Sequence, residues 1–389
     1  MTRTWTSRQR VEAALNFEEP DRVPIDLTIT LNAYRNLREY LGLPPEENIR
    51  ADRFYEVEPA LDVLETLGID VTFVKLRGPR NWQAPPPTPD GIMFDEWGVG
   101  RRRVEVSPGV FLLEVVYSPF ADKDPSEIDL DAYPWPDPHD PGRTDGLAEY
   151  ARSLYENTDL ALMGRFGGTI MEQAAFLRGY EQWLMDLALY PDFARDLMNR
   201  IADIQIALDE AGLRAAGPYL SIFKLSGEDL GMQDRPLFSP RVWQKILRPI
   251  LSRRWRAARA VLDEVAPHVK LMLHSDGSIR SFLPDLIEDG VDMIDPVQVS
   301  CAGMEPDGLK RDFGNRLAFH GAIDTQHVLP FGTPEEVAAH VRDIIRALAP
   351  GGGFILAPVH NVQADVPPQN LVAMCEAARK YGQYPIAAD

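Results

Sequence analysis

The sequence contains few cysteines and no long apolar segment. Cys301 and Cys375 are the two cysteines among 389 residues, too few for a disulfide framework or a cysteine-rich zinc site. No apolar run approaches the roughly 20 residues that cross a bilayer. Residues 1–24 lack the apolar core of a secretory signal. We therefore expect a cytoplasmic protein without a membrane partner.

Clustered positive charge and nucleotide-binding motifs are also missing. The formal net charge is −19, whereas proteins that grip a nucleic-acid backbone need clustered Lys and Arg. We expect no nucleic-acid partner. There is no Walker loop, nucleophile elbow or Ser-His-Asp signal. No G-x-G-x-x-G follows the first apolar run, which disfavours an open, doubly wound sheet.

The pattern that is present is a rhythm of short apolar runs separated by helical segments. Strands that alternate with helices indicate a parallel sheet, and eight such units favour a (β/α)8 TIM barrel. We predict one barrel domain over residues 1–389. The eight runs are 23–27, 70–74, 160–166, 221–227, 269–275, 291–297, 317–323 and 353–359.

Residues 81–145 interrupt this rhythm. A proline-rich stretch is followed by alternating apolar and polar residues with glycine turns, which is typical of antiparallel strands. A second proline-rich stretch, 133–143, reads as a rigid linker. We predict an insertion on the barrel rim that contains a β-hairpin.

Polar residues follow the apolar runs at the points where strands should end. Active sites of (β/α)8 barrels form at these carboxyl ends. We therefore treat such residues as site candidates, although a strand-end histidine can also serve only as a structural hydrogen-bond partner. The candidates are Asp26, Lys75, Arg165, Glu172, Lys224, Asp229, His274, Asp276, Asp295, Gln298, His320, His360 and Asn361.

Two histidines and one carboxylate among these candidates suggest a metal site. His274 and Asp276 form an H-x-D pair before Gly277, and His360 follows a nearby strand. Three such ligands with one open position are typical of catalytic zinc. The same donors also suit iron(II), so donor type alone leaves the metal open.

Several segments together resemble the uroporphyrinogen decarboxylase superfamily. They include "GEDLGMQDRPLFSP", "LHSDGSI", "FLPDLIEDGVDMIDPVQ" and "FHGAIDTQHVLPFGTPEEV". The resemblance runs from about residue 7 to the C-terminus, apart from 81–145. It implies a TIM barrel with one of two activities: porphyrin decarboxylation, or methyl transfer that depends on a corrinoid protein.

The departures from the superfamily pattern favour methyl transfer. The decarboxylases carry an arginine-rich "RQAGRY" segment, whereas this chain has "TITLNAYRNLREY". The thiol-activating zinc methyltransferases carry H-x-C and a later Cys, whereas Asp276 and His360 stand here. Such harder ligands suit an oxygen leaving group. The resemblance thus implies an O-demethylase-like methyltransferase, acting on a small O-methylated or N-methylated substrate.

This reading assigns roles to the candidate residues. Zinc would be held by the protein and the corrinoid by a partner protein. The oligomeric state stays open between monomer and homodimer. Two alternatives stay open: a decarboxylase or lyase on a smaller acid anchored by Arg165 or Lys224, and a non-catalytic ligand-binding barrel. The assigned roles are metal binding for His274, Asp276 and His360, catalysis for Glu172, Asp229 and His320, and substrate binding for Asp26, Arg165, Lys224, Gln298 and Asn361.

Overall fold

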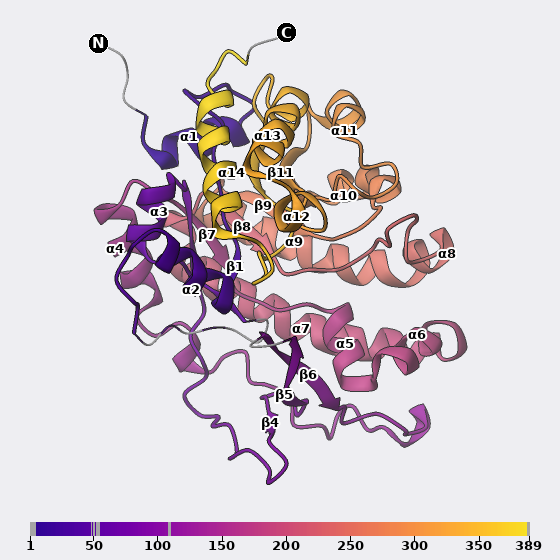
Figure 1. Ribbon diagram of the computed structural model, residues 1–389. Helices are drawn as coiled ribbons and strands as arrows, with labels where there is room; N and C mark the ends of the chain where they lie inside the picture. The colour runs from indigo at the N-terminus through magenta and orange to yellow at the C-terminus, as the bar shows by residue number, and fades with distance from the viewer. Residues whose placement is uncertain (1–4, 48, 50, 52–54, 108–109, 387–389) are drawn as a thin grey trace.

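A curled sheet of parallel strands forms the centre of the protein (Figure 1). The computed structural model describes residues 5–47, 49, 51, 55–107 and 110–386. Each strand of this sheet lies beside its predecessor in the chain, without the reversal of a doubly wound sheet. The parallel α/β prediction is confirmed. The strands are β3 (Val71–Lys75), β7 (Ala161–Arg165), β8 (Ile222–Leu225), β9 (Lys270–His274), β10 (Met293–Val297), β11 (Ala318–Ile323) and β12 (Phe354–Pro358).

The first of the eight predicted strands, 23–27, is extended but is joined to the sheet by isolated bridges. The amide of Asp26 donates to Leu356 O and the amide of Leu356 donates to Pro24 O, both at 2.9 Å. On the other side, the Asp70 amide donates to Ile25 O at 2.8 Å, just before β3. This segment therefore touches both edges of the seven-stranded sheet. Nearby, β1 (Ile29–Thr30) pairs antiparallel with β2 (Glu56–Val57).

Helices cover the outer face of the sheet (Figure 1). α13 shows how the sequence sets one of them: Thr333 and Glu336 form a capping box, and Pro334 occupies the first turn. None of the helices in the described part of the chain combines the length and apolar character of a membrane span. The helices are α1 (Ser7–Leu15), α2 (Leu31–Tyr40), α3 (Leu61–Leu67), α4 (Leu147–Asn157), α5 (Met171–Arg178), α6 (Tyr180–Leu189), α7 (Pro191–Ala216), α8 (Pro240–Val242), α9 (Arg248–Val265), α10 (Leu283–Glu288), α11 (Pro306–Phe313), α12 (Val328–Phe331), α13 (Pro334–Leu348) and α14 (Pro368–Tyr381).

The inner face of the sheet has its own apolar core. One or two residues from each of the seven strands form a buried cluster with Val11 and Leu15 of α1. Side chains alternate between the two faces of a strand, so the other strand residues pack against the helices in the larger cluster. The inner cluster consists of Val11, Leu15, Val71, Phe73, Ala161, Met163, Ile222, Met272, Met293, Ala318 and Ile355.

Residues 81–145 contain a separate antiparallel sheet. Its strands are β4 (Ile92–Phe94), β5 (Gly100–Ser107) and β6 (Val110–Tyr117), in that order. The turn expected between β5 and β6 includes residues 108–109, which lie outside the described residues. Trp97, Val99 and Phe120 are buried in the same cluster as the helices around the parallel sheet. The segment therefore shares a core with the rest of the chain.

Candidate active site

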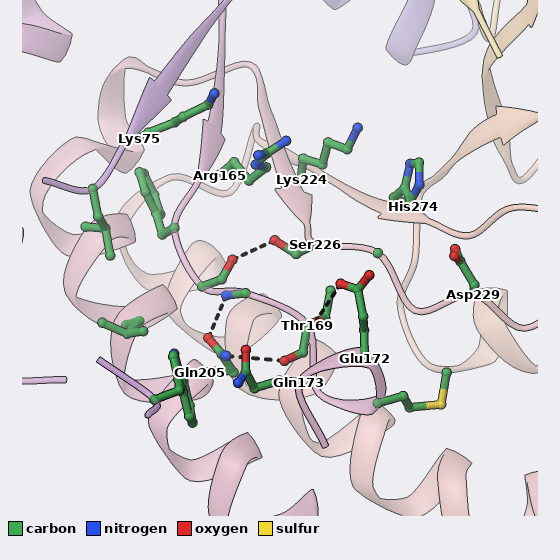
Figure 2. Close-up of a pocket in the computed structure, with 18 of the residues that line it drawn as sticks. Lys75, Arg165, Thr169, Glu172, Gln173, Gln205, Lys224, Ser226, Asp229 and His274 are labelled. Carbon is green, nitrogen blue, oxygen red and sulfur yellow. Dashed lines mark hydrogen bonds between the residues drawn. The ribbon is translucent and has the colours of Figure 1, made fainter. Parts of the chain in front are cut away.

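Residues at the carboxyl ends of β3, β7, β8 and β9, and residues that follow β12, line a cavity of about 760 Å³. Most of the residues expected at a site contribute to its wall, and Glu96, Trp97 and Arg143 of the inserted segment line it as well. Lys75, Arg165 and Lys224 lie in a row along one side, followed by His274 (Figure 2). The predicted site residues in the wall are Arg165, Glu172, Lys224, Asp229, His274, Asp276, His360 and Asn361.

The alternation of strand residues explains why these side chains meet. In β3, Val71 and Phe73 face the inner core, so Lys75, two residues further, points to the same side. The same step of two leads from inner apolar residues to polar residues at the ends of β7 and β9, one residue before the end of β8, and in the middle of β10 and β11. These polar residues are Arg165, Lys224, His274, Asp295 and His320.

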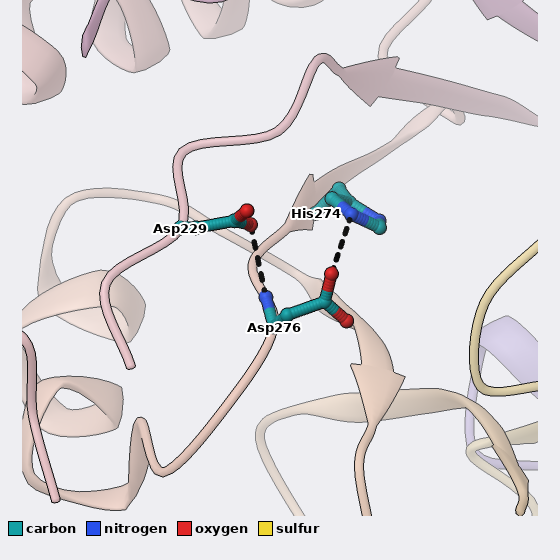
Figure 3. A group of neighbouring side chains, drawn as sticks. All are labelled: Asp229, His274 and Asp276. Atoms are coloured by element: carbon teal, nitrogen blue, oxygen red, sulfur yellow. Dashed lines mark hydrogen bonds and ion pairs between the residues drawn. The ribbon is translucent and has the colours of Figure 1, made fainter. Parts of the chain in front are cut away.

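Three side chains in the cavity wall place possible metal-ligand atoms within 4.8 Å of one another (Figure 3). These are Asp229, His274 and Asp276. Nε2 of His274 lies 3.5 Å from Oδ2 of Asp276, and the Asp276 amide donates to Oδ1 of Asp229 at 3.2 Å. One imidazole and two carboxylates are a donor set that suits a divalent metal such as zinc or iron(II).

Glycines allow the loops that carry this group to meet. Gly277 has a φ of +90°, and a Cβ atom there would lie 2.4 Å from the backbone of Gly231. The loop after β9, with Asp276, therefore packs directly on the loop after β8, with Asp229. Gly227 is needed for a different reason, since a Cβ atom there would lie 2.6 Å from Cδ2 of His274.

His360 lies beside this group and not within it. Its Nε2 is 4.0 Å from Oδ2 of Asp276, its ring centroid is 6.3 Å from that of His274, and its side chain is half exposed. Two of the three residues expected to bind metal thus belong to the observed group. Asp229, expected as a catalytic group, takes the third place.

A buried carboxylate, Asp295, holds His274 from behind. Nδ1 of His274 lies 2.7 Å from Oδ2 of Asp295, and Nδ1 of His320 lies 2.6 Å from Oδ1. Burial by itself lowers the pKa of His274, but the charge of Asp295 and hydrogen bonds to Asp276 and Asp295 outweigh it and raise the pKa to about 10. Metal-binding histidines are neutral, so a metal ion at Nε2 replaces a proton.

Asp26 and His320 lie behind the cavity wall, which differs from their expected roles in substrate binding and catalysis. Asp26 is 1% exposed and His320 is 2% exposed, and Nε2 of His320 lies 3.0 Å from Oδ2 of Asp26. Both face inward, but His320 contacts Asp295, Asp26 contacts His320, and neither lines the cavity. Gln298 also lies outside the wall and accepts a hydrogen bond from the Gly277 amide at 2.8 Å, so it supports the turn after Asp276.

A row of cations beside the metal-binding group includes two side chains that contact a buried glutamate. Arg165 Nη1 lies 3.1 Å from Oε2 of Glu56, and Lys75 Nζ lies 3.5 Å from its Oε1. Burial raises the pKa of Glu56, but the charges of Arg165, Lys75 and Lys224 outweigh burial and lower it to about 2. Lys224 Nζ also lies 2.5 Å from Oδ2 of Asp295. This arrangement suits an anionic part of a ligand.

Glu228 connects the metal-binding group to Glu172. Its carboxylate accepts hydrogen bonds from the amides of Ile170 and Met171 at 2.6 and 2.9 Å, where α5 begins. Its own amide donates to His274 O at 3.0 Å. Burial raises the pKa of the Glu228 carboxyl to about 8. Glu172, in the first turn of α5, lines the cavity and accepts a hydrogen bond from Thr169 Oγ1 at 3.3 Å.

Glu56, Glu228 and Asp295 received no role from the sequence. Asp295 and Lys75 were among the candidates without an assigned role, and the step of two along each strand accounts for their inward position, because both follow inner apolar residues. Glu56 stands in a two-residue strand that no apolar run marks. Glu228 directly follows the run 221–227, as Asp229 nearly does, but its burial depends on contacts with α5 that the local sequence does not reveal.

The fold and the site define an α/β enzyme class in which a polar, metal-competent cavity opens at the carboxyl ends of parallel strands. Comparison with known families names the group: the family model described as uroporphyrinogen decarboxylase (URO-D) matches residues 115–381. The chain belongs to the uroporphyrinogen decarboxylase family.

Individual relatives are more distant. A uroporphyrinogen decarboxylase from Magnetococcus marinus is 23% identical over 195 residues, 49% of either chain. One from Actinobacillus succinogenes is 22% identical over 196 residues, 50% of either chain. The matches thus span about half the length of these relatives. A solved structure of a methyltransferase from Methanosarcina mazei aligns with a TM-score of 0.62 and 16% identity, over 97% of this chain and 99% of that one. This likeness concerns the fold.

Proposed function

We propose that the protein is a methyltransferase that removes a methyl group from a small O-methylated substrate and passes it to a corrinoid protein. The observation that carries this proposal is the convergence of Asp229, His274 and Asp276 in the wall of a 760 Å³ cavity. Family membership and the fold shared with a methyltransferase support it. An N-methylated substrate would use the same site.

The residues of the cavity would have two roles, substrate binding and metal binding. Arg165 and Lys224 would hold an anionic substituent of the substrate, and Asn361 lies beside them, with Nδ2 3.4 Å from Oε2 of Glu56. The metal-binding group stands next to Lys224, since Lys224 and His274 share Asp295. A substrate anchored by its anion would therefore present its methoxy group toward His274.

Breaking the methyl–oxygen bond leaves both electrons of that bond on oxygen. Glu172, in the cavity wall, would exchange a proton with the leaving oxygen, and Asp229, expected as a catalytic group, would bind the metal instead. When bound at Asp229, His274 and Asp276, zinc would supply Lewis acidity at that oxygen, and the partner's reduced corrinoid would be the methyl acceptor. His360, half exposed beside Asp276, would contact substrate or complete the ligand set.

A decarboxylase or lyase acting on a smaller acid is the second candidate. The cations Lys75, Arg165 and Lys224 favour it because they can anchor a carboxylate, and the curated relatives are decarboxylases. A non-catalytic barrel fits less well, because titratable groups converge in an open cavity.

The closed form of the barrel is part of the proposal. Residues 23–27 would serve as its eighth strand, which their hydrogen bonds to both edges of the sheet support. Residues 81–145 would form a rim insertion within one domain, which their share of the common core supports.

Methyl transfer can be tested with purified protein, zinc and a panel of methoxylated aromatic acids, with reduced cobalamin as a stand-in acceptor. We expect methylcobalamin to form, visible in its absorption spectrum, and no demethylated product when the acceptor is omitted. Release of carbon dioxide from acids by the isolated chain, without methylcobalamin, would support the second candidate instead.

A further inference from the structure

The proposed metal site rests on a buried chain of charged side chains. From the cavity inward, His274 contacts Asp295, Asp295 contacts His320, and His320 contacts Asp26, with nitrogen–oxygen distances of 2.7, 2.6 and 3.0 Å. Lys224 joins at Asp295, at 2.5 Å. Asp295, His320 and Asp26 are each less than 5% exposed. Their partners are therefore protein groups and not bulk water.

Hydrogen-bond chemistry fixes the orientation of His274. An ionised carboxylate only accepts, so Nδ1 of His274 must donate to Asp295. Its Nε2 then faces Asp276 at the longer distance of 3.5 Å, where a metal ion would replace the Nε2 proton. Both oxygens of Asp295 are used, since one receives His274 and Lys224 and the other receives His320.

A structural role alone does not account for this chain. Inner-face positions one layer deeper hold apolar residues, including Met272, Met293 and Ala318. Buried ion networks are often no more stable than apolar residues of similar volume. The network therefore adds little to the free energy of unfolding compared with an apolar layer at the same place. It reaches the cavity through His274 and Lys224, which line the wall.

We propose that Asp295 is a positioning residue for the proposed metal site. It fixes His274 with Nε2 toward Asp229 and Asp276, and it holds Lys224 at a set distance from that group. Asp26 and His320 anchor Asp295 from behind. This role rests on the proposed metal-dependent function, but it concerns metal binding and can be measured without any methyl donor.

The test compares zinc affinity in Asp295→Asn and Asp295→Ala with the wild-type protein. Asparagine keeps one acceptor oxygen for His274, and its amide can face a neutral His320, so the fold should survive. Loss of a carboxylate that orients a ligand histidine typically lowers metal affinity about 10- to 100-fold. We expect about 10-fold for Asp295→Asn and about 100-fold for Asp295→Ala. Competition with a chromogenic chelator gives the affinities, and the absorption spectrum of the cobalt(II)-loaded protein reports the ligand geometry.

Asp70→Asn is the matched control. Asp70 is equally buried and binds Arg10 and Arg22, but it precedes β3 at the opposite end of the strands. This variant should lower the melting temperature while leaving zinc affinity and the cobalt spectrum unchanged. Wild-type zinc affinity in both Asp295 variants would overturn the positioning role and leave the proposed reaction intact. A wild-type protein that binds no zinc would overturn both.

Discussion

Replacing Gly227 with alanine perturbs the candidate site by a defined distance. A Cβ atom at residue 227 would lie 2.6 Å from Cδ2 and 3.5 Å from Nε2 of His274. Non-bonded carbon atoms prefer separations of about 3.5–4.0 Å, so the imidazole must retreat by about 1 Å. Gly227 does not have a positive φ, so alanine adds no backbone strain and the clash with His274 is the main effect.

The retreat of the ring should weaken metal binding strongly. Nδ1 of His274 now lies 2.7 Å from Oδ2 of Asp295, and a shift of about 1 Å exceeds hydrogen-bond range. A hydrogen bond to a charged group contributes about 1.5–3 kcal/mol. If the loss falls on the metal-bound state, zinc affinity should decrease roughly 10- to 150-fold. The fold should persist, because the ring lies in the cavity wall.

Chelator competition and thermal unfolding, measured side by side, separate the effect on zinc binding from the effect on stability. Gly308→Ala in α11 is the control, because its Cβ atom would meet the ends of two flexible side chains, Arg280 at 3.4 Å and Arg311 at 3.8 Å. It should keep wild-type zinc affinity. If Gly227→Ala also binds zinc within twofold of the wild type, His274 is not a ligand and the proposed metal group is wrong.

Four further variants test other parts of the site. Asp229→Ala should lose most bound zinc while His360→Ala retains most of it, as measured by elemental analysis; the opposite order would restore His360 as the third ligand. Arg165→Gln should raise KM for methoxylated carboxylates roughly 10- to 100-fold, the size of a lost charged hydrogen bond, and should leave KM for their methyl esters unchanged; an equal rise for both would rule out anion binding. The pKa of Glu56 is about 2 in the folded protein against an ordinary 4.5, so its stabilising contribution is full above pH 4.5 and is lost as the pH falls toward 2. Glu56→Gln should therefore flatten the fall in unfolding free energy across that interval, and an unchanged acid profile would contradict the assignment.

Much of the fold was predictable from short stretches of sequence. Seven of the eight apolar runs form the parallel strands, because buried strands need continuous apolar residues whatever their neighbours. The run 23–27, predicted as the first strand, forms an isolated bridge from Ile25 to Leu356, more than 300 residues away, and accepts a hydrogen bond from the Asp70 amide. The position of this run between the two edges of the seven-stranded sheet cannot be predicted from the pattern of apolar residues within it.

Some features of the candidate site were also predictable from the sequence, and others were not. The step of two along each strand is a local property, so the sequence by itself determined that His274 and Lys224 would face inward at the strand ends. Whether an inward-facing side chain reaches the cavity is not a local property. Asp26 and His320 follow the same pattern, yet both are buried and do not line the cavity. The sequence assigned His360 to the metal and Asp229 to catalysis, whereas Asp229 is the residue that lies with His274 and Asp276. The position of Asp229 depends on the contact between Gly231 and Gly277. These glycines lie in two loops that the curvature of the sheet brings together. The sequence therefore determined which side chains face the centre, and the tertiary structure decided which of them meet, because meeting distances are set by the curvature of the sheet and the packing of its loops.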